Sequence, residues 1–191
     1  MMIDLGINAG TGGNNWIAYK PQADQWDYPE GEIGLKYFIM DKDSMKAGWG
    51  KLAPGIAPSW QWDAKLGIVE TNPGGTVEEK DEWKRGLSIE LYIKDEGVFT
   101  WATTALGPMQ GLNNIYQEVF NDQGDNPNLL PVIEYTGSEA TTWKKGQSRI
   151  PQFKIVKWTE RPDDWDSLDN AKPEAEAAPV AEEKPQDDIP F

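Results

Sequence analysis

Residues 87–94, Leu-Ser-Ile-Glu-Leu-Tyr-Ile-Lys, decide which fold class this chain can adopt. Aliphatic and more polar side chains alternate along them, and a period of two is typical of a strand with one buried face. Residues 95–97, Asp-Glu-Gly, then predict a turn, and residues 98–103, Val-Phe-Thr-Trp-Ala-Thr, predict the partner strand of a hairpin. The sequence therefore predicts antiparallel β structure at its centre.

A single helix is predicted directly after this hairpin. Pro108 suits a first helical turn, where its missing N–H would have no helical partner in any case. The apolar residues of the following turns share one face, namely Leu112, Ile115, Tyr116, Val119 and Phe120. The polar stretch 121–128 ends the helix. The remaining strands are expected at residues 33–40, 65–70, 130–135 and 153–158.

The order of these elements indicates one architecture. Two strands, a long hairpin, one helix and two further strands follow the order of the OB-fold. That fold is a mainly β, five-stranded Greek-key barrel, here with one helix between strands 3 and 4, and it commonly binds oligonucleotides or oligosaccharides on one face. The barrel domain is expected to span residues 1–161.

A domain of this length would be large for the fold, so its excess residues are expected in long loops. The predicted loops are residues 42–62, with a short helical turn near 44–47, residues 71–84 and residues 136–149. Residues 1–32 are expected to form an arm or loose edge with four aromatic packing points, namely Trp16, Tyr19, Trp26 and Tyr28.

The composition excludes several kinds of chemistry. The 191 residues carry a formal net charge of −14 and include neither Cys nor His, which removes disulfides, thiolate nucleophiles, Cys-based zinc sites and His general bases. The acidic group at 122–128 lacks the EF-hand spacing, and Gly10-Thr11-Gly12-Gly13 lacks the lysine of a phosphate loop. We therefore expect no enzyme, no cofactor and no metal.

No secretion signal and no apolar run as long as a membrane span is visible in the sequence. We expect a soluble protein that does not contact a membrane and lies in the cytoplasm, which would be the host-cell cytoplasm if a phage encodes it.

Residues 162–191 differ in composition from the rest of the chain. They hold ten acidic residues and two lysines, a net charge of −8, and they are rich in Ala and Pro. Such a segment cannot bury enough apolar surface to offset the entropy of ordering it, so we expect a disordered acidic tail. Trp165 and Leu168 are expected to pack near the point where the tail leaves the domain.

The tail ends in a motif that can dock as one unit, Asp187-Asp188-Ile189-Pro190-Phe191. A ring at the terminal position can fill an apolar pocket, while the terminal carboxylate and the two Asp side chains can meet Lys or Arg at its rim. This end resembles the C-terminal tip of bacterial and phage single-stranded DNA-binding proteins, in which an acidic spacer ends in Asp-Asp-Ile-Pro-Phe or a close variant. The phage proteins look closer, because the length and the Trp-rich loops depart from the bacterial pattern.

The resemblance implies an OB-fold protein that coats single-stranded DNA without sequence preference during replication, recombination or repair. It also implies that the acidic tip recruits replication or recombination proteins, and it leaves a homo-oligomer open. The close match covers the tip alone, so no DNA-binding residue carries over from the family.

Candidate DNA-binding residues come instead from the pairing of flat rings with cations, which hold bases and phosphates respectively. Three clusters interleave the two kinds of side chain. The first is Lys46, Trp49, Lys51, Trp60, Trp62 and Lys65; the second is Trp83, Lys84, Arg85, Tyr92 and Lys94; the third is Trp143, Lys144, Lys145, Arg149 and Lys154. For each residue the alternative is a core tryptophan or a solvated lysine, and Trp101 and Trp158 are expected to be core or barrel-face residues.

A carbohydrate-binding β module is the alternative function. Tryptophan platforms on an acidic β domain suit sugar rings, and residues 1–161 have a net charge of −6, whereas a nucleic-acid binder is expected to be basic. This alternative leaves the Ile-Pro-Phe end unexplained.

Overall fold

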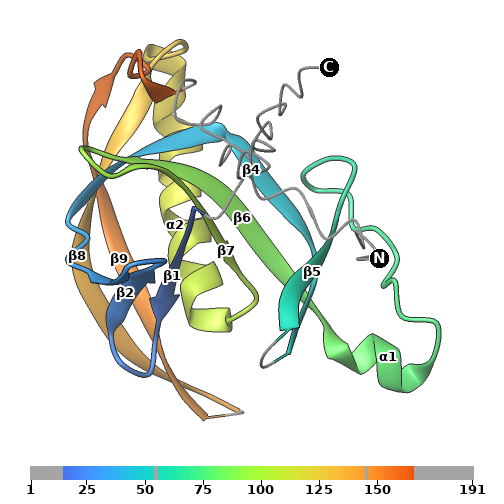
Figure 1. The fold of residues 1–191 in the computed structure, drawn as a ribbon. Coiled ribbons are helices and arrows are strands. Elements are labelled where there is room, and N and C mark those ends of the chain that lie inside the picture. Colours follow the sequence, from blue (N-terminus) through green and yellow to red (C-terminus); the bar gives the residue numbers. More distant parts are fainter. Residues whose placement is uncertain (1–14, 54–55, 145, 166–191) are drawn as a thin grey trace, which may run out of the picture.

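The computed structural model describes residues 15–53, 56–144 and 146–165 (Figure 1). Their fold is mainly β, as the sequence predicts, and the strands curl around one long helix, α2 (Leu106–Asp122). The predicted tail tip and residues 1–14 lie outside the described residues. No helix of the described ranges is long and apolar enough to cross a membrane.

The strands differ widely in length. The first half of the chain contributes β1 (Trp16–Lys20), β2 (Gln25–Tyr28), β3 (Gly31–Ile33), β4 (Tyr37–Ala53) and β5 (Ile56–Trp62). The rest of the chain contributes β6 (Trp83–Ile93), β7 (Gly97–Thr103), β8 (Leu130–Trp143) and β9 (Gly146–Thr159). A short helix, α1 (Val77–Glu82), precedes β6, and one turn of 3-10 helix, η1 (Gln123–Asp125), follows α2.

One curled, open sheet contains all these strands. Its order is β3-β2-β1-β7-β6-β4-β8-β9, and β5 pairs with β4 off this path. Neighbours are antiparallel except β1 and β7, which run parallel. The long strand β4 is the centre of the sheet, because it pairs with β6 along most of its length, with β8 at its start and with β5 near its end.

The central hairpin is confirmed. Strands β6 and β7 pair from Leu87 opposite Thr103 to Ile93 opposite Gly97. Asp95, with φ 68°, and Gly97, with φ 109°, take the left-handed backbone conformation that a tight hairpin turn requires. The strands predicted at 130–135 and 153–158 are also confirmed, but they are longer than predicted and meet as one hairpin at Trp143 and Gly146.

The loop predicted at 42–62 is wrong, and so is its helical turn. Strand β4 continues through this stretch to Ala53, and β5 returns beside it. Gly48 and Gly50, which suggested a loop, are strand residues over which large side chains of β5 lie.

The strand predicted at 65–70 is also wrong. This segment belongs to a loop between β5 and α1, in which Gly67 has φ 85° and the amide of Ile68 donates to the carbonyl of Lys65. The charged residues after it form α1, whose start is a capping box between Thr76 and Glu79.

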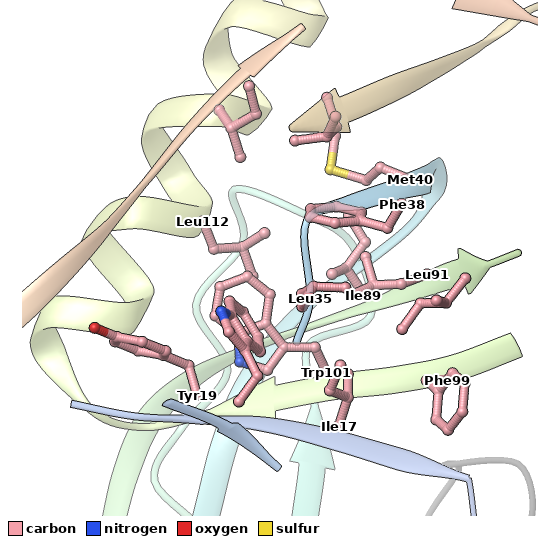
Figure 2. Packing of buried hydrophobic residues seen from close by; sticks show 14 of the residues in the cluster. Ile17, Tyr19, Leu35, Phe38, Met40, Ile89, Leu91, Phe99, Trp101 and Leu112 are labelled. Carbon is pink, nitrogen blue, oxygen red and sulfur yellow. The ribbon is translucent and has the colours of Figure 1, made fainter. Parts of the chain in front are cut away.

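Buried side chains from the strands and from α2 form one main core (Figure 2). Ile89 and Leu91 of β6 contribute with the predicted alternation, and Phe38 and Met40 come from β4. The predicted helix face is confirmed for Leu112, Ile115 and Val119, which are buried, and Tyr116 is half-buried. Phe120 is 59% exposed, so its place on that face was wrongly predicted.

The N-terminal strands β1 and β2 close the curl against β8 and β9 through side chains. Asp24, in the turn between β1 and β2, accepts hydrogen bonds from Tyr19 Oη at 2.6 Å and Ser138 Oγ at 2.5 Å. It also lies 3.1 Å from the guanidinium of Arg149. The ring of Trp26 packs edge-on to Tyr135, 5.7 Å between centroids. We call the polar part of this contact the Asp24 clasp; it joins hairpins that share no backbone ladder in the described residues.

The chain remains packed on the domain as far as Trp165, which is fully buried as predicted. Its ring stacks on Tyr92 with centroids 5.6 Å apart, and the guanidinium of Arg161 lies 4.4 Å from the centroid of the same ring. Tyr92 Oη donates to Asp164 at 3.0 Å. Leu168 lies outside the described residues.

Candidate functional site

Three strands extend beyond the end of β7 as an arm (Figure 1). The arm consists of residues 46–51 of β4, 59–62 of β5 and 83–86 of β6, and we call it the β5 arm. Strand β7 stops opposite Leu87, so no strand of the described residues pairs with the edge of β6 from Trp83 to Gly86 on that side. Of the predicted binding residues, Trp49, Lys51, Trp60, Trp62, Trp83, Lys84 and Arg85 all lie on this arm.

The two faces of the arm follow from the register. Arg85 and Leu87 share one face of β6, and Leu87 packs against the main core, so this is the inner face. Gly86 and Lys84 point to the outer face, together with Gly48 and Gly50 of β4, which pair with them. Trp62 and Trp60 of β5 pair with the same two β4 glycines and therefore also occupy the outer face.

Trp60 and Trp62 stack on each other across this outer face. Their ring centroids are 4.6 Å apart and their planes differ by 9°. The rings reach over β4, because a Cβ added to Gly50 would lie 2.5 Å from Cζ3 of Trp60, and one added to Gly48 would lie 2.8 Å from Cε3 of Trp62. A Cβ on Gly86 would also meet Trp60, at 2.5 Å. Glycine at these three positions is therefore what lets the two half-buried indoles lie against the sheet.

Two exposed lysines flank the indole pair on the same face. Lys46 precedes Gly48 by two residues on β4, and Lys84 lies opposite Gly50. Neither ammonium group forms an ion pair with a carboxylate among the described residues, although Lys84 Nζ donates to the carbonyl of Asp81. The outer face of the arm thus offers flat rings between positive charges.

The side chains on the inner face of the arm contact the loop before α1 and the end of α1. Trp49 Nε1 donates to the carbonyl of Glu70 at 2.8 Å, and the guanidinium of Arg85 lies 5.2 Å from the Trp49 ring centroid. The guanidinium of Arg85 also donates two hydrogen bonds to the carboxylate of Asp63, of 2.9 and 2.5 Å. The Arg85 hydrogen bonds hold the pKa of Asp63 below its usual value, and the same contact raises the pKa of Arg85. Lys51 pairs with Glu82.

A hollow of about 320 Å³ opens beside the arm, between β6, the start of α2 and the tip of the β8–β9 hairpin. We call it the α2 hollow. The residues that line it are Arg85, Gly86, Leu87, Leu106, Met109, Gln110, Asn113 and Trp143. Gly86 lies under Trp60 on the outer face and also lines this hollow, whose Arg85 and Leu87 belong to the inner face. The indole pair and the hollow therefore lie on opposite faces of β6 and meet at its edge.

The other predicted binding residues lie elsewhere or are already paired. Lys154 pairs with Glu134 on the β8–β9 hairpin, and Arg149 belongs to the Asp24 clasp. Tyr92 is stacked on Trp165, and with Lys94 it lines a separate hollow of about 350 Å³ on the outer side of β4 and β8. Lys65 is exposed in the loop before α1, Lys144 is exposed at the β8–β9 tip, and Lys145 lies outside the described residues.

The sequence prediction overlooked the glycines and the amides of the site. Gly48 and Gly50 form a Gly-Trp-Gly run that pairs with the Trp-Gln-Trp run at 60–62, and this matched alternation is a signal that could have revealed the stacked pair. Gln110 and Asn113 carried no signal, because polar residues on an exposed helix face are common.

Among the described residues, no group of acidic side chains is arranged to hold a metal ion. Comparison of the chain with known protein families, with curated proteins and with solved structures finds no match.

Proposed function

We propose that this chain binds single-stranded DNA with little dependence on base sequence and coats it during replication, recombination or repair. The observation that carries the proposal is the stacked pair of Trp60 and Trp62, which packs over glycines between Lys46 and Lys84. Rings that stack on any base and cations that follow the backbone are the combination used by proteins that bind single strands nonspecifically.

We assign the strands β4, β6, β7, β8 and β9 to an OB-type barrel. Two observations support the assignment: β4 pairs with both β6 and β8, and α2 lies between the third and fourth of these strands. Such barrels bind oligonucleotides with strands 2 and 3 and with the loops that follow strands 1 and 4. Here those parts are β6, β7, the segment that contains β5, and the β8–β9 tip. The β5 arm combines β5 and the start of β6 with the end of β4, and the α2 hollow combines β6 and the β8–β9 tip with the start of α2.

We propose two roles for the acidic tail, and both rest on its sequence. The terminal Asp-Asp-Ile-Pro-Phe would recruit replication or recombination proteins through the ring of Phe191 and the carboxylates beside it. A tethered polyanion would also compete with DNA for Lys46 and Lys84, because tethering gives it a high effective concentration. Phe191→Ala should weaken the partner complex and leave DNA affinity unchanged; equal loss of both would contradict the docking role.

The direct test is titration of a fluorescent oligothymidylate with the full chain and with Trp60→Ala. Loss of one stacking contact should weaken binding by roughly tenfold, since base–aromatic stacking contributes about 1–3 kcal/mol. Trp16→Ala is the control, because Trp16 is also a strand tryptophan with an accessible ring, 45% exposed, but lies on β1 outside the arm. The affinity of the full chain should fall with salt, with a log–log slope of about −0.7 per phosphate contacted.

Equal affinities for the two variants would contradict the role of the indole pair. A chain with no affinity for oligothymidylate even at low salt would contradict the proposed function altogether. Soluble glycans are the informative competitors in the same assay, because a carbohydrate-binding module would release the probe to them and a DNA-coating protein would not.

A further inference from the structure

The α2 hollow combines apolar walls, one aromatic ring and two side-chain amides. Leu87 of β6 and Leu106 and Met109 of α2 supply the apolar surface, and Trp143 of the β8–β9 tip supplies the ring. Its volume of about 320 Å³ lies at the small end of ligand pockets, which span roughly 300–1,000 Å³. The hollow therefore suits one small, flat and largely apolar group.

The two amides, Gln110 and Asn113, lie one turn apart on α2, where both line the hollow. Gln110 Nε2 donates to Asn114 Oδ1 at 2.7 Å, which fixes the Gln110 amide and leaves its oxygen as an acceptor. Asn113 is exposed and forms no side-chain hydrogen bond within the described residues, so its amide can donate and accept at once. A flat group with a donor beside an acceptor on one edge would satisfy it.

The surroundings of the hollow favour a group attached to a polyanion. It adjoins the Trp60–Trp62 pair across Gly86, where no strand of the described residues pairs with that edge of β6. Lys84 lies at the same edge, and the exposed Lys144 follows Trp143 at the opposite wall. A single strand of DNA that crosses the edge of β6 would thus keep its phosphates near Lys84 and Lys144 while one of its bases enters the hollow.

We propose that the α2 hollow binds one unpaired adenine base of a single strand, stacked on Trp143 and recognised by the amide of Asn113. The inference rests on the proposed function and adds to it a local base preference within otherwise nonspecific binding. Every base offers a donor beside an acceptor on its Watson–Crick edge, but adenine alone repeats the pair on its major-groove edge, at N6 and N7, where a side-chain amide is its usual bidentate partner. Recognition of splayed bases by an aromatic ring and edge hydrogen bonds is the general mode for single strands.

The test compares short fluorescent oligothymidylates that carry one central dA, dC or dG, titrated with the full chain and with Asn113→Ala. The full chain should bind the dA oligomer roughly tenfold more tightly than the dC oligomer, as expected for one bidentate amide contact. In Asn113→Ala this ratio should approach one, because the dA oligomer loses an amide contact that the dC oligomer does not make. Gln117→Ala is the matched control, because Gln117 is an exposed amide on α2 that does not line the hollow.

The outcomes separate this inference from the proposed function. If the full chain binds all oligomers equally, or if Asn113→Ala keeps the preference for dA, the adenine site is wrong and nonspecific strand binding stands. If no oligomer binds at low salt, both fail. Adenosine monophosphate is added as a competitor in every titration; if it displaces the dA oligomer at equal concentration, the hollow is a free-nucleotide site and the inference is overturned.

Discussion

Asp24 connects the N-terminal hairpin to the rest of the sheet, and its charge should therefore contribute to stability. Hydrogen bonds from Ser138 and Tyr19 hold the pKa of Asp24 below its usual value. A carboxyl group whose pKa is lower in the folded than in the unfolded chain stabilises the fold above the unfolded pKa of about 3.9. That contribution is lost as the pH falls through the folded pKa.

We predict that Asp24→Asn lowers the free energy of unfolding by about 1 kcal/mol at pH 7, a modest loss because the side chain is partly exposed. Asparagine tolerates the left-handed backbone of this position, where φ is 54°, so the substitution changes mainly the charge. Urea unfolding at several pH values is the measurement. The difference from the natural chain should shrink below about pH 4; a constant difference down to pH 2 would show that the charge is not the cause.

Arg85 was predicted to bind DNA, but its contacts indicate a structural role. The side chain of Asp63 is 1% exposed and depends on the Arg85 guanidinium for charge compensation. We predict that Arg85→Gln destabilises the fold by about 3 kcal/mol, because it leaves a buried carboxylate without its counter-ion. The double variant Asp63→Asn, Arg85→Gln should recover much of that loss in thermal unfolding. A stable Arg85→Gln that no longer binds oligothymidylate would instead assign Arg85 to the DNA contact.

At the level of elements, the β5 arm depends on glycine in strand positions. We predict that Gly50→Ala weakens oligothymidylate binding about tenfold, because the new methyl group would displace Trp60 from its stack. It should also destabilise the fold by about 1–3 kcal/mol, as overpacking does. Near-ultraviolet circular dichroism reports the change in indole geometry. Gly34→Ala is the control, since no atom lies within 4 Å of its added Cβ, and a similar effect of both variants would exclude the indole pair as the cause.

The elements that were predicted correctly from the sequence are those whose apolar residues recur with a clear period. Leu87, Ile89 and Leu91 alternate on one face of β6; Ile89 and Leu91 are buried as expected, and Leu87 is partly buried against the same core. The α2 residues Leu112 and Ile115 follow the helical spacing and are buried too. In both cases the pattern works because the apolar residues that recur with the period of the element share the face that packs against the core.

The β5 arm could not be predicted in this way, because its outer face carries glycines beneath tryptophans and its inner face carries ion pairs, so apolar and polar residues do not alternate along it. Its glycines indicated a loop, although they are needed for the approach of Trp60 and Trp62. The reverse error occurred at Ile68 and Val69, whose β-branched side chains suggested a strand. Val69 is 68% exposed, and the segment lies in the loop whose Glu70 carbonyl accepts from Trp49.

At the scale of the whole molecule, the boundary between domain and tail can be tested with two truncations. A chain that ends at Trp165 should unfold at the same temperature as the full chain. A chain that ends at Arg161 should lose about 3 kcal/mol, because removal of a fully buried tryptophan exposes Val98, Leu130 and Tyr92. Equal stability of the two truncations would show that the Trp165 contact contributes little.

The chain that ends at Trp165 also isolates the charge effect of the tail. Residues 166–191 carry eight acidic residues and two lysines. If this polyanion competes with DNA, the chain that ends at Trp165 should bind oligothymidylate more tightly than the full chain, and the gain should diminish at high salt. Unchanged affinity at low salt would exclude that competition while leaving partner recruitment to be tested with Phe191→Ala.

The parallel pairing of β1 with β7 has a consequence for biosynthesis. Strand β1 pairs early with β2, but Trp16 aligns with Thr100, so the other edge of β1 gains its partner β7 only after more than half of the chain has been translated. Contacts of such long sequence separation form late in folding. The N-terminal hairpin therefore leaves the ribosome with this edge of β1 unpaired, and it can dock on the sheet only after β7 has been synthesised.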